Sequence, residues 1–385
     1  MTSPGHATDS GALVTYPLLA GIAALLSFAL TPVVRRLAIR MDAIDHPGRR
    51  RVHSSPVPSL GGLAVLVASL GTLSLASLAG VPVIDRLAAR GWELEWLLAG
   101  VLLAVATGVR DDTHGLAPLP KLALIVAAAA VAVAGGYGLR GFTEPVTGTY
   151  VEFGAVGGLV TVGWIVVVTN AFNLVDGLDG LASGVALIAS TTLLAVSLIE
   201  GRDDVALLWA VLGGSLLGFL PYNFFPASIF LGDSGSYLLG YLLAVLAIQS
   251  LEKGATLVVV LVPVLALGLP VTEVVSTVLR RSASRGAATI MRADRGHIHH
   301  RLLRQGLSHR GAVLTLYAVC AGLGALAFLA VIGQGAASAL VVGIGGIATF
   351  AGIAWLRASR RRPPAPRSSR PSERPRARRA GQAPE

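Results

Sequence analysis

Two adjacent carboxylates and a lysine form the first of several polar motifs in a chain that is otherwise strongly apolar. Asp111 and Asp112 follow an apolar run, and Lys121 lies ten residues after Asp111. Adjacent carboxylates repel each other, so the pair suits a bound cation, or one of the two can act as a general base. A lysine can hold a phosphate group as a point charge. Acidic residues that cap a helix beside a solvated loop explain this motif equally well when it is taken alone.

The second motif, NAFNLVDGLDGL, covers residues 170–181 and joins two apolar segments. Its amide and carboxylate side chains recur every three residues: Asn170, Asn173, Asp176 and Asp179. This spacing places them along one side of a helix end or a tight turn. Their oxygens are of the kind that Mg²⁺ prefers, and the glycines allow the backbone to approach a ligand closely. A turn rich in Asn, Asp and Gly is the alternative. An EF-hand is excluded because the glutamate at its twelfth position is absent.

The third motif is FLGDSGS, residues 230–236, at the start of another apolar segment. Asp233 lies there among small residues. A helix N-terminus with small residues is a natural phosphate site, and a carboxylate beside it can hold the metal that bridges the phosphates. An ordinary N-cap aspartate would have the same local sequence. Because the other motifs are expected on the same membrane face, we favour a metal-binding role for Asp233.

The fourth motif is DRGHIHHR, residues 294–301, in a long polar stretch. It holds three of the chain's eight histidines: His297, His299 and His300. Zinc is one interpretation, but three histidines so close in sequence strain tetrahedral geometry. Binding of phosphate or sugar, aided by Arg295 and Arg301, is favoured, and a solvated basic loop is the alternative. A further histidine, His53, lies in the Pro-rich segment 45–62, which we interpret as a shaped entry to the next apolar segment.

The elements that must position these motifs are expected to be membrane helices. Of the 385 residues, 54% are hydrophobic and only 14% are charged, against about 25% charged in a soluble domain. The mean hydropathy is +0.70, which places the chain in the membrane class. Its one cysteine, Cys320, excludes an internal disulfide and a cysteine metal site. The first ten residues lack the basic region of a signal peptide, so the first apolar segment is expected to be a retained helix.

Apolar segments of about the ~20 residues needed to cross a bilayer occur eleven times. They cover residues 12–34, 60–80, 95–109, 121–139, 157–173, 180–199, 205–221, 235–251, 255–278, 311–332 and 336–356. The fold class is therefore an all-α polytopic membrane protein with about eleven transmembrane helices. Residues 140–156 show alternation along the chain, as strands do, and include turn residues. They are expected to form a small hairpin on the outer face.

Basic residues set the expected orientation. With the N-terminus outside, 26 of the 31 Lys and Arg residues lie on the inner side, so the C-terminus is predicted to be cytosolic. One transmembrane catalytic domain is expected over residues 1–356, with its active-site loops in the cytosol, including the long loop 281–310. The tail 357–385 is rich in Pro, Arg and Ser and is expected to be disordered. It is interpreted as a topology anchor, with binding to anionic lipid as the alternative. Nucleic-acid binding is not expected, because no folded basic domain accompanies the tail.

In their order along the chain, the motifs resemble those of the polyprenyl-phosphate N-acetylhexosamine-1-phosphate transferases of glycosyltransferase family 4. The resemblance runs over residues 46–310 and implies an enzyme of a bacterial inner membrane. It implies transfer of a sugar phosphate from a UDP-N-acetylhexosamine to undecaprenyl or decaprenyl phosphate, with release of UMP. Mg²⁺ is the expected cofactor, with Mn²⁺ as a substitute. Membrane lipids are expected partners, and a homodimer is left open.

The resemblance also implies roles for single residues. Asn173 and Asp233 would ligate Mg²⁺ with the UDP diphosphate, and Lys121 would hold a phosphate. Asp111 would be the base or the orienting group for the lipid phosphate, with Asp112 beside it. The substrate-binding set would be Asn170, Asp176, Asp179, His297, His299, His300, Arg301 and His53. Within that set Asp179 would contact uracil, Asp176 would support the site, and the histidines of the fourth motif would contact the diphosphate or the sugar.

The form of the histidine motif, with Ile298 between His297 and His299, is similar to that of the N-acetylglucosamine branch of the family. The branch that uses UDP-MurNAc-pentapeptide tends toward three consecutive histidines, and it remains the alternative. The chain departs from the family pattern at Ser59, where arginine is frequent, and near Val126, where a glutamine is frequent. The first difference alters the expected ion pairing between loops, and the second removes the side chain for one polar contact that the family pattern implies.

Two other classes of protein fit the sequence less well. A transporter would place charged residues near the membrane midplane and would show an internal repeat. The sequence shows neither, because its acidic residues lie at one membrane face. A catalytically inactive scaffold would have lost its paired aspartates, and these are intact.

Overall fold

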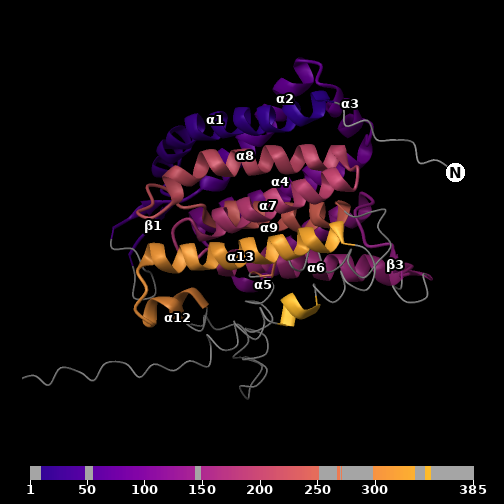
Figure 1. Cartoon of the computed structure of the whole chain (residues 1–385). Coiled ribbons are helices and arrows are strands. Elements are labelled where there is room, and N and C mark those ends of the chain that lie inside the picture. The colour runs from indigo at the N-terminus through magenta and orange to yellow at the C-terminus, as the bar shows by residue number, and fades with distance from the viewer. Residues whose placement is uncertain are drawn as a thin grey trace, which may run out of the picture.

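A computed structural model describes residues 10–47, 55–143, 149–250, 267–268, 270, 298–333 and 343–347 of the chain. The described part is a bundle of helices (Figure 1). The helices are α1 (Ser10–Arg40), α2 (Gly61–Leu78), α3 (Pro82–Ala88), α4 (Trp92–His114), α5 (Pro118–Ala134), α6 (Ala155–Val175), α7 (Leu181–Ile199), α8 (Asp203–Asn223), α9 (Gly232–Gln249), α12 (Ile298–Arg304) and α13 (His309–Ile332). The strands are β1 (Ile44–Asp45), β2 (Val57–Pro58), β3 (Gly141–Thr143) and β4 (Tyr150–Glu152).

Within the described residues, seven helices are long and apolar enough to cross a membrane: α1, α2, α4, α6, α7, α8 and α13. Together with α5 and α9 they correspond to nine of the predicted segments. Most of segment 255–278 and most of segment 336–356 lie outside the described residues. A polytopic helical architecture is thus confirmed, whereas the count of eleven helices and the orientation stay predictions. The predicted hairpin at 140–156 is present as the antiparallel pair β3–β4.

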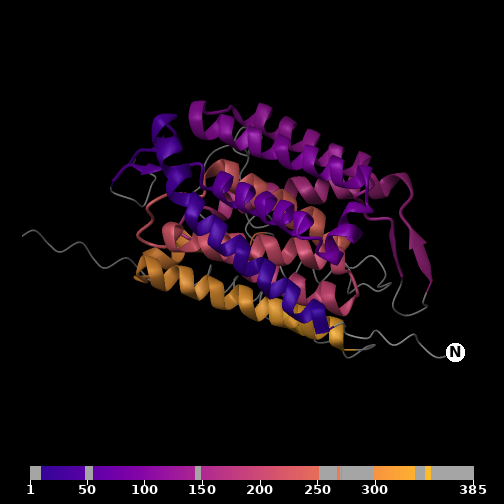
Figure 2. The ribbon, with the colours of Figure 1, turned by 90° about the horizontal axis from the view of Figure 1, so that it is seen from above.

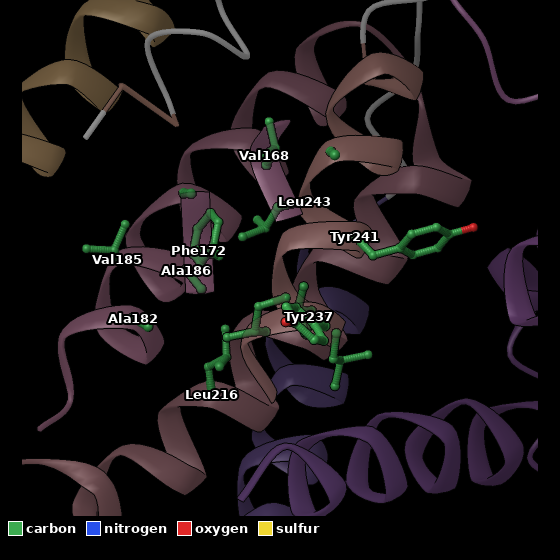
Figure 3. Packing of buried hydrophobic residues seen from close by; sticks show 14 of the residues in the cluster. Val168, Phe172, Ala182, Val185, Ala186, Leu216, Tyr237, Tyr241 and Leu243 are labelled. Atoms are coloured by element: carbon green, nitrogen blue, oxygen red, sulfur yellow. The ribbon is translucent and has the colours of Figure 1, made fainter. Parts of the chain in front are cut away.

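Helix α9 is the centre of the bundle, and it packs against α2, α4, α6 and α7. Figure 3 shows Tyr237 and Tyr241 of α9 with buried side chains of α6, α7 and α8. The Tyr241 ring points away from these side chains and toward Gly100 of α4. Both tyrosines are buried. Gly240 lets α9 approach α6, because a Cβ at this position would come within 2.5 Å of the Thr169 Cα atom. Small residues that allow backbones to meet are typical of helix packing in membranes.

Helix α1 crosses the bundle obliquely (Figure 2). It lies on α8 and α2. The contact with α8 is made at Gly214 and Gly218, where an added Cβ would collide with the backbone of Ala20 and Ala24 respectively. A pair of glycines four residues apart lies on one face of a helix and permits this close approach.

The helices run back and forth between two ends of the bundle, and each end has its own hairpin. The β1–β2 pair lies at one end, whereas α3 and the β3–β4 hairpin lie at the other (Figure 1). At the first end the backbone N–H of Phe230 donates to Pro58 O at 2.8 Å, and the N–H of Gly61 donates to Phe230 O at 3.0 Å. These bonds join the segment before α9 to the start of α2, and so fix the place where α9 begins.

At the opposite end, charged side chains hold the start of α8 against the segment that links α3 to α4. Arg90 donates from Nε to Asp204 Oδ2 at 2.5 Å and from Nη1 to Gln249 Oε1 at 3.4 Å. Arg86 pairs with Asp203, which also accepts a hydrogen bond from the Tyr16 hydroxyl at 3.1 Å. The side chain of Arg90 is 12% exposed and that of Asp204 is 17% exposed, so this ion pair is largely shielded from water.

Replacement of Arg90 by methionine is expected to lower the stability of the fold by about 2 kcal/mol, because the largely buried Asp204 carboxylate loses a charge-assisted hydrogen bond. The Arg202 side chain, whose Nε atom lies 3.7 Å from Asp204 Oδ1, still balances part of that charge. The measurement is the midpoint of thermal unfolding of the purified protein in detergent. The exchange Glu152→Gln, on the exposed strand β4, is the control and should leave the midpoint unchanged. An Arg90→Met midpoint equal to that of the wild type would contradict the role of this pair.

Candidate functional site

Side chains from four helices meet at the end of the bundle that carries β1 and β2. The Lys121 ammonium group forms ion pairs with the carboxylates of Asp111 and of Asp233. Its Nζ atom lies 3.3 Å from Asp233 Oδ2. Asn173 donates from Nδ2 to Asp233 Oδ1 at 2.6 Å and to the Ser236 hydroxyl oxygen at 3.1 Å. The structure therefore unites residues from three of the predicted motifs around Asp233.

The turn between α4 and α5 fixes the first pair of this cluster. Helix α4 ends at His114, and the next residue, Gly115, has φ +69° and donates from its N–H to Asp111 O at 2.9 Å. The Leu116 N–H donates to Asp111 Oδ1 at 2.8 Å, which leaves Oδ2 for Lys121. Pro118 begins α5, a position that suits its fixed φ. Lys121 follows in the first turn of α5 and reaches back to the end of α4.

Asp112 faces a different neighbour from Asp111. Its Oδ1 atom accepts a hydrogen bond from the Asp233 N–H at 2.8 Å, and its Oδ2 atom accepts one from the Ser234 N–H at 3.0 Å. The Ser59 hydroxyl also donates to Oδ1, at 3.2 Å. Two of the N–H groups that the sequence suggested for phosphate binding at the start of α9 are thus bonded to Asp112.

Glycines bring the start of α9 against α4 and α2. Gly232 has φ +76°, and a Cβ there would come within 2.6 Å of Asp112 Oδ2. A Cβ on Gly108 would overlap the backbone of Ser234, and one on Gly62 would overlap Gly235. A side chain at Gly108 or Gly62 would require movement of backbone atoms, and one at Gly232 would be strained by its positive φ. The glycines therefore allow α2, α4 and α9 to meet closely next to Asp233.

Asp176 lies in the turn between α6 and α7, next to the cluster. Withdrawal from water, together with the negative charges of Asp233, Asp112 and Asp179, raises the pKa of Asp176 well above its usual range. The predicted three-residue register does not continue as one helical face, because α6 ends at Val175.

Asn170 and Asp179 lie outside the group around Asp233. The Nδ2 atom of Asn170 donates to Val166 O of its own helix at 2.8 Å. Asp179 accepts a hydrogen bond from the Ala227 N–H at 2.9 Å through Oδ2, and its own N–H donates to His309 Nε2 at 3.1 Å. The His309 ring stacks on Phe225 with 4.3 Å between the ring centroids. Asp179 therefore anchors a second group of side chains.

The histidine motif is described only in part. His53 and His297 lie outside the described residues. His299 and His300 belong to α12, whose side chains are described from Arg301 onward. Helix α12 packs against α13, and Arg301 is half-buried. The roles predicted for these residues stay predictions.

The donor set is suited to a hard divalent cation. Carboxylates of Asp111, Asp112, Asp176 and Asp233 gather in this region, and Lys121 balances part of their charge. An excess of carboxylate and amide oxygens favours Mg²⁺. In the described part of the chain, no three Asp, Glu, His or Cys side chains form a preformed coordination shell. A bound Mg²⁺ would therefore complete its shell with water and phosphate oxygens, as this ion usually does.

Several residues that contact the site are not among the residues predicted from the sequence to be functional. Ser59 was noted only as a departure from a family pattern, yet its hydroxyl contacts Asp112. Gly108 looks like any small residue in an apolar segment, and His309 is a single histidine at the start of α13. The signal available for Gly108 was its place four residues before Asp112, which puts both on one face of a helix. Ser59 and His309 carried no comparable signal, because their partners are distant in sequence.

Comparison with known proteins agrees with these observations. The sequence model of the family described as glycosyl transferase family 4 matches residues 94–251 of the chain. A probable undecaprenyl-phosphate N-acetylglucosaminyl 1-phosphate transferase of Bacillus subtilis is 36% identical over 298 residues, which cover 77% of this chain and 80% of that protein. A decaprenyl-phosphate N-acetylglucosaminephosphotransferase of Mycolicibacterium smegmatis is 34% identical and covers 90% of this chain and 88% of its own length. A phospho-N-acetylmuramoyl-pentapeptide-transferase of Streptococcus pyogenes is 28% identical over 335 residues, 81% of this chain and 97% of that protein.

Proposed function

The chain belongs to glycosyl transferase family 4, and from this premise we propose that it transfers N-acetylglucosamine 1-phosphate from UDP-N-acetylglucosamine to a polyprenyl phosphate, with release of UMP. The observation that carries the proposal is the convergence of Asp111, Lys121, Asn173 and Asp233 at one end of the bundle. Joining two phosphate-bearing substrates requires positive charge and oxygen ligands for a cation in one place, and this cluster supplies both.

The reaction that fits this site is a direct displacement at the β-phosphorus of the UDP-sugar. An oxygen of the lipid phosphate forms a bond to that phosphorus, and the bond to the oxygen bridging the α- and β-phosphorus atoms breaks, so UMP leaves. Asp111 would orient the lipid phosphate or accept its proton. Lys121 would hold a phosphate against the repulsion between the two substrates. Asn173 and Asp233 would hold Mg²⁺, which supplies electrostatic stabilisation of the phosphate oxygens when bound.

A two-step route through a phosphorylated Asp111 is the minor alternative. In that route the Asp111 carboxylate attacks the β-phosphorus and UMP leaves first, after which the lipid phosphate displaces the aspartate. It predicts that radiolabelled UMP exchanges into the UDP-sugar in the absence of lipid. Direct displacement predicts no such exchange.

The site is assigned to the cytosolic face of a bacterial inner membrane. The excess of basic residues on the predicted inner side, 26 of 31, supports this orientation. A nucleotide-sugar donor is made in the cytosol, so the same orientation gives the donor access to the cluster. A homodimer remains a prediction about assembly.

N-acetylglucosamine is favoured over the UDP-MurNAc-pentapeptide alternative for two reasons. Relatives named for N-acetylglucosamine transfer are 31–36% identical, whereas the pentapeptide transferase is 28% identical. Ile298 also interrupts the histidine run. A transporter is disfavoured, because the ionisable cluster lies at one end of the bundle rather than at its middle.

Purified protein supplied with Mg²⁺ and polyprenyl phosphate should release UMP from UDP-N-acetylglucosamine. The panel of donors also includes UDP-N-acetylgalactosamine and UDP-MurNAc-pentapeptide. Omission of the polyprenyl phosphate, or removal of divalent cations with EDTA, should stop the release. If no donor yields UMP although the protein shows a cooperative thermal unfolding transition, and is therefore folded, the proposed reaction is refuted. Release from the pentapeptide donor alone would refute the choice of sugar.

A further inference from the structure

The two neighbouring aspartates at the end of α4 have separate surroundings. Successive residues of an α-helix point about 100° apart, so the two carboxylates reach Asp233 at different places: Asp111 lies beside its side chain, and Asp112 accepts from its backbone N–H. Asp111 contacts Lys121 through its side chain. Asp112 contacts the backbone of α9 with both of its oxygens, at 2.8 Å and 3.0 Å from the N–H nitrogens.

The contacts of Asp112 are those of a helix cap supplied by another helix. Helix α9 begins at Gly232, and the residue before it, Leu231, offers no side chain that could cap the helix. The N–H groups of Asp233 and Ser234 are the second and third of the helix, and these are the groups that an N-cap side chain normally satisfies. Asp112 takes the place of the missing cap.

The packing around this contact leaves little freedom. Gly108, one turn before Asp112, allows α4 to touch the Ser234 backbone. Gly232 has φ +76°, which carries the chain past Asp112 and Ser59 without a Cβ. The Ser59 hydroxyl donates to Asp112 from the side of β2. The Asp112 carboxylate is therefore held from two sides while it holds the start of α9.

We propose that Asp112 is a positioning residue, which caps α9 in trans and thereby directs the Asp233 side chain toward Asn173 and Lys121. Asp112 accepts a hydrogen bond from the backbone N–H of Asp233 itself. The two carboxylate oxygens of Asp233 lie 2.6 Å from Asn173 Nδ2 and 3.3 Å from Lys121 Nζ. A shift of the first turn of α9 would change both contacts at once. The role of Asp112 in turnover rests on the proposed function, whereas the capping itself does not.

The first test measures capping without any reaction. Hydrogen–deuterium exchange of peptides that cover the start of α9 should become faster in Asp112→Ala, which has no acceptor. It should be intermediate in Asp112→Asn, which keeps one acceptor oxygen. The control Asp85→Asn changes an exposed carboxylate on α3 and should leave the exchange as in the wild type. Unchanged exchange in Asp112→Ala would overturn the proposal whether or not the protein transfers sugar phosphate.

The second test separates positioning from direct chemistry. In Asp112→Asn we expect kcat to fall roughly 10-fold, in line with a partial displacement of a catalytic group. The KM for the UDP-sugar, the pH profile and the Mg²⁺ concentration for half-maximal rate should match the wild type. Asp112→Ala should lose more turnover than Asp112→Asn. A changed pH profile, a changed Mg²⁺ requirement or a complete loss of turnover in folded Asp112→Asn would overturn the proposal. Absence of turnover in the wild type would instead count against the proposed function.

Discussion

Replacement of Asp233 by asparagine is expected to reduce UMP release by on the order of 1,000-fold, while the protein still inserts into the membrane. The substitution preserves the size of the side chain but removes its negative charge. It leaves Lys121 facing a neutral amide, and it weakens the oxygen set proposed to hold Mg²⁺. The loss should appear in kcat more than in the KM for the lipid, because Asp233 is assigned to the reacting phosphates.

The control for this substitution is again Asp85→Asn, which makes the same chemical change on α3 at the far end of the bundle. Both variants should show the thermal midpoint and the detergent-extracted yield of the wild type. Turnover of Asp233→Asn within a few-fold of the wild type would refute the role of Asp233 at the cation. A wild-type rate with a lowered midpoint would show that the residue serves stability alone.

Replacement of Gly108 by alanine is expected to lower turnover by about 100-fold, although Gly108 has no chemical group of its own. The added methyl group would overlap the backbone of Ser234, so α4 and α9 would have to separate. Overpacking of this kind costs about 1–3 kcal/mol, and a displacement of ~1 Å at a catalytic group costs about 100-fold in rate. The rate should therefore fall together with the midpoint of thermal unfolding.

The matched control is Gly163→Ala on α6, where an added Cβ meets nothing within 4 Å among the described atoms. Because alanine is the better helix former by about 1 kcal/mol, this variant should be as stable as the wild type or more stable, and fully active. Equal turnover in Gly108→Ala and Gly163→Ala would show that the close contact between α4 and α9 is not needed for the reaction.

The sequence predicted the helices better than it predicted their contacts. Length and apolarity located α7 and α13 to within two residues at each end, because any helix that crosses a bilayer needs a similar length of apolar sequence. Helix α1 continues six residues beyond its predicted end, to Arg40. The short helix α3 was missed, since its seven residues, Pro82–Ala88, carry no membrane signal. The ion pairs of Arg90 with Asp204 were missed as well, because they join residues more than a hundred positions apart in the chain.

For the candidate site, too, the sequence predicted the residues better than it predicted their contacts. Residue types predicted that Asp111, Lys121 and Asp233 share a site, because carboxylates and lysines are costly in an apolar chain, and the three side chains do lie together. Nothing in the pair Asp111–Asp112 showed which of them would face Lys121 and which would face the backbone of α9. That choice depends on the rotation of α4 about its axis, and the rotation is set by packing at Gly108. It is a property of the assembled bundle rather than of the local sequence.

The central place of α9 has a mechanical consequence. The helix that carries Asp233 is surrounded by α2, α4, α6 and α7, so it has protein neighbours where the outer helices have lipid. A thinner or stiffer bilayer would tilt α1 or α13 before it displaced α9. Asp233 and its contact with Asn173 of the neighbouring α6 are thus shielded from lateral stress in the membrane, so this contact should respond little to the acyl-chain length of the surrounding lipid.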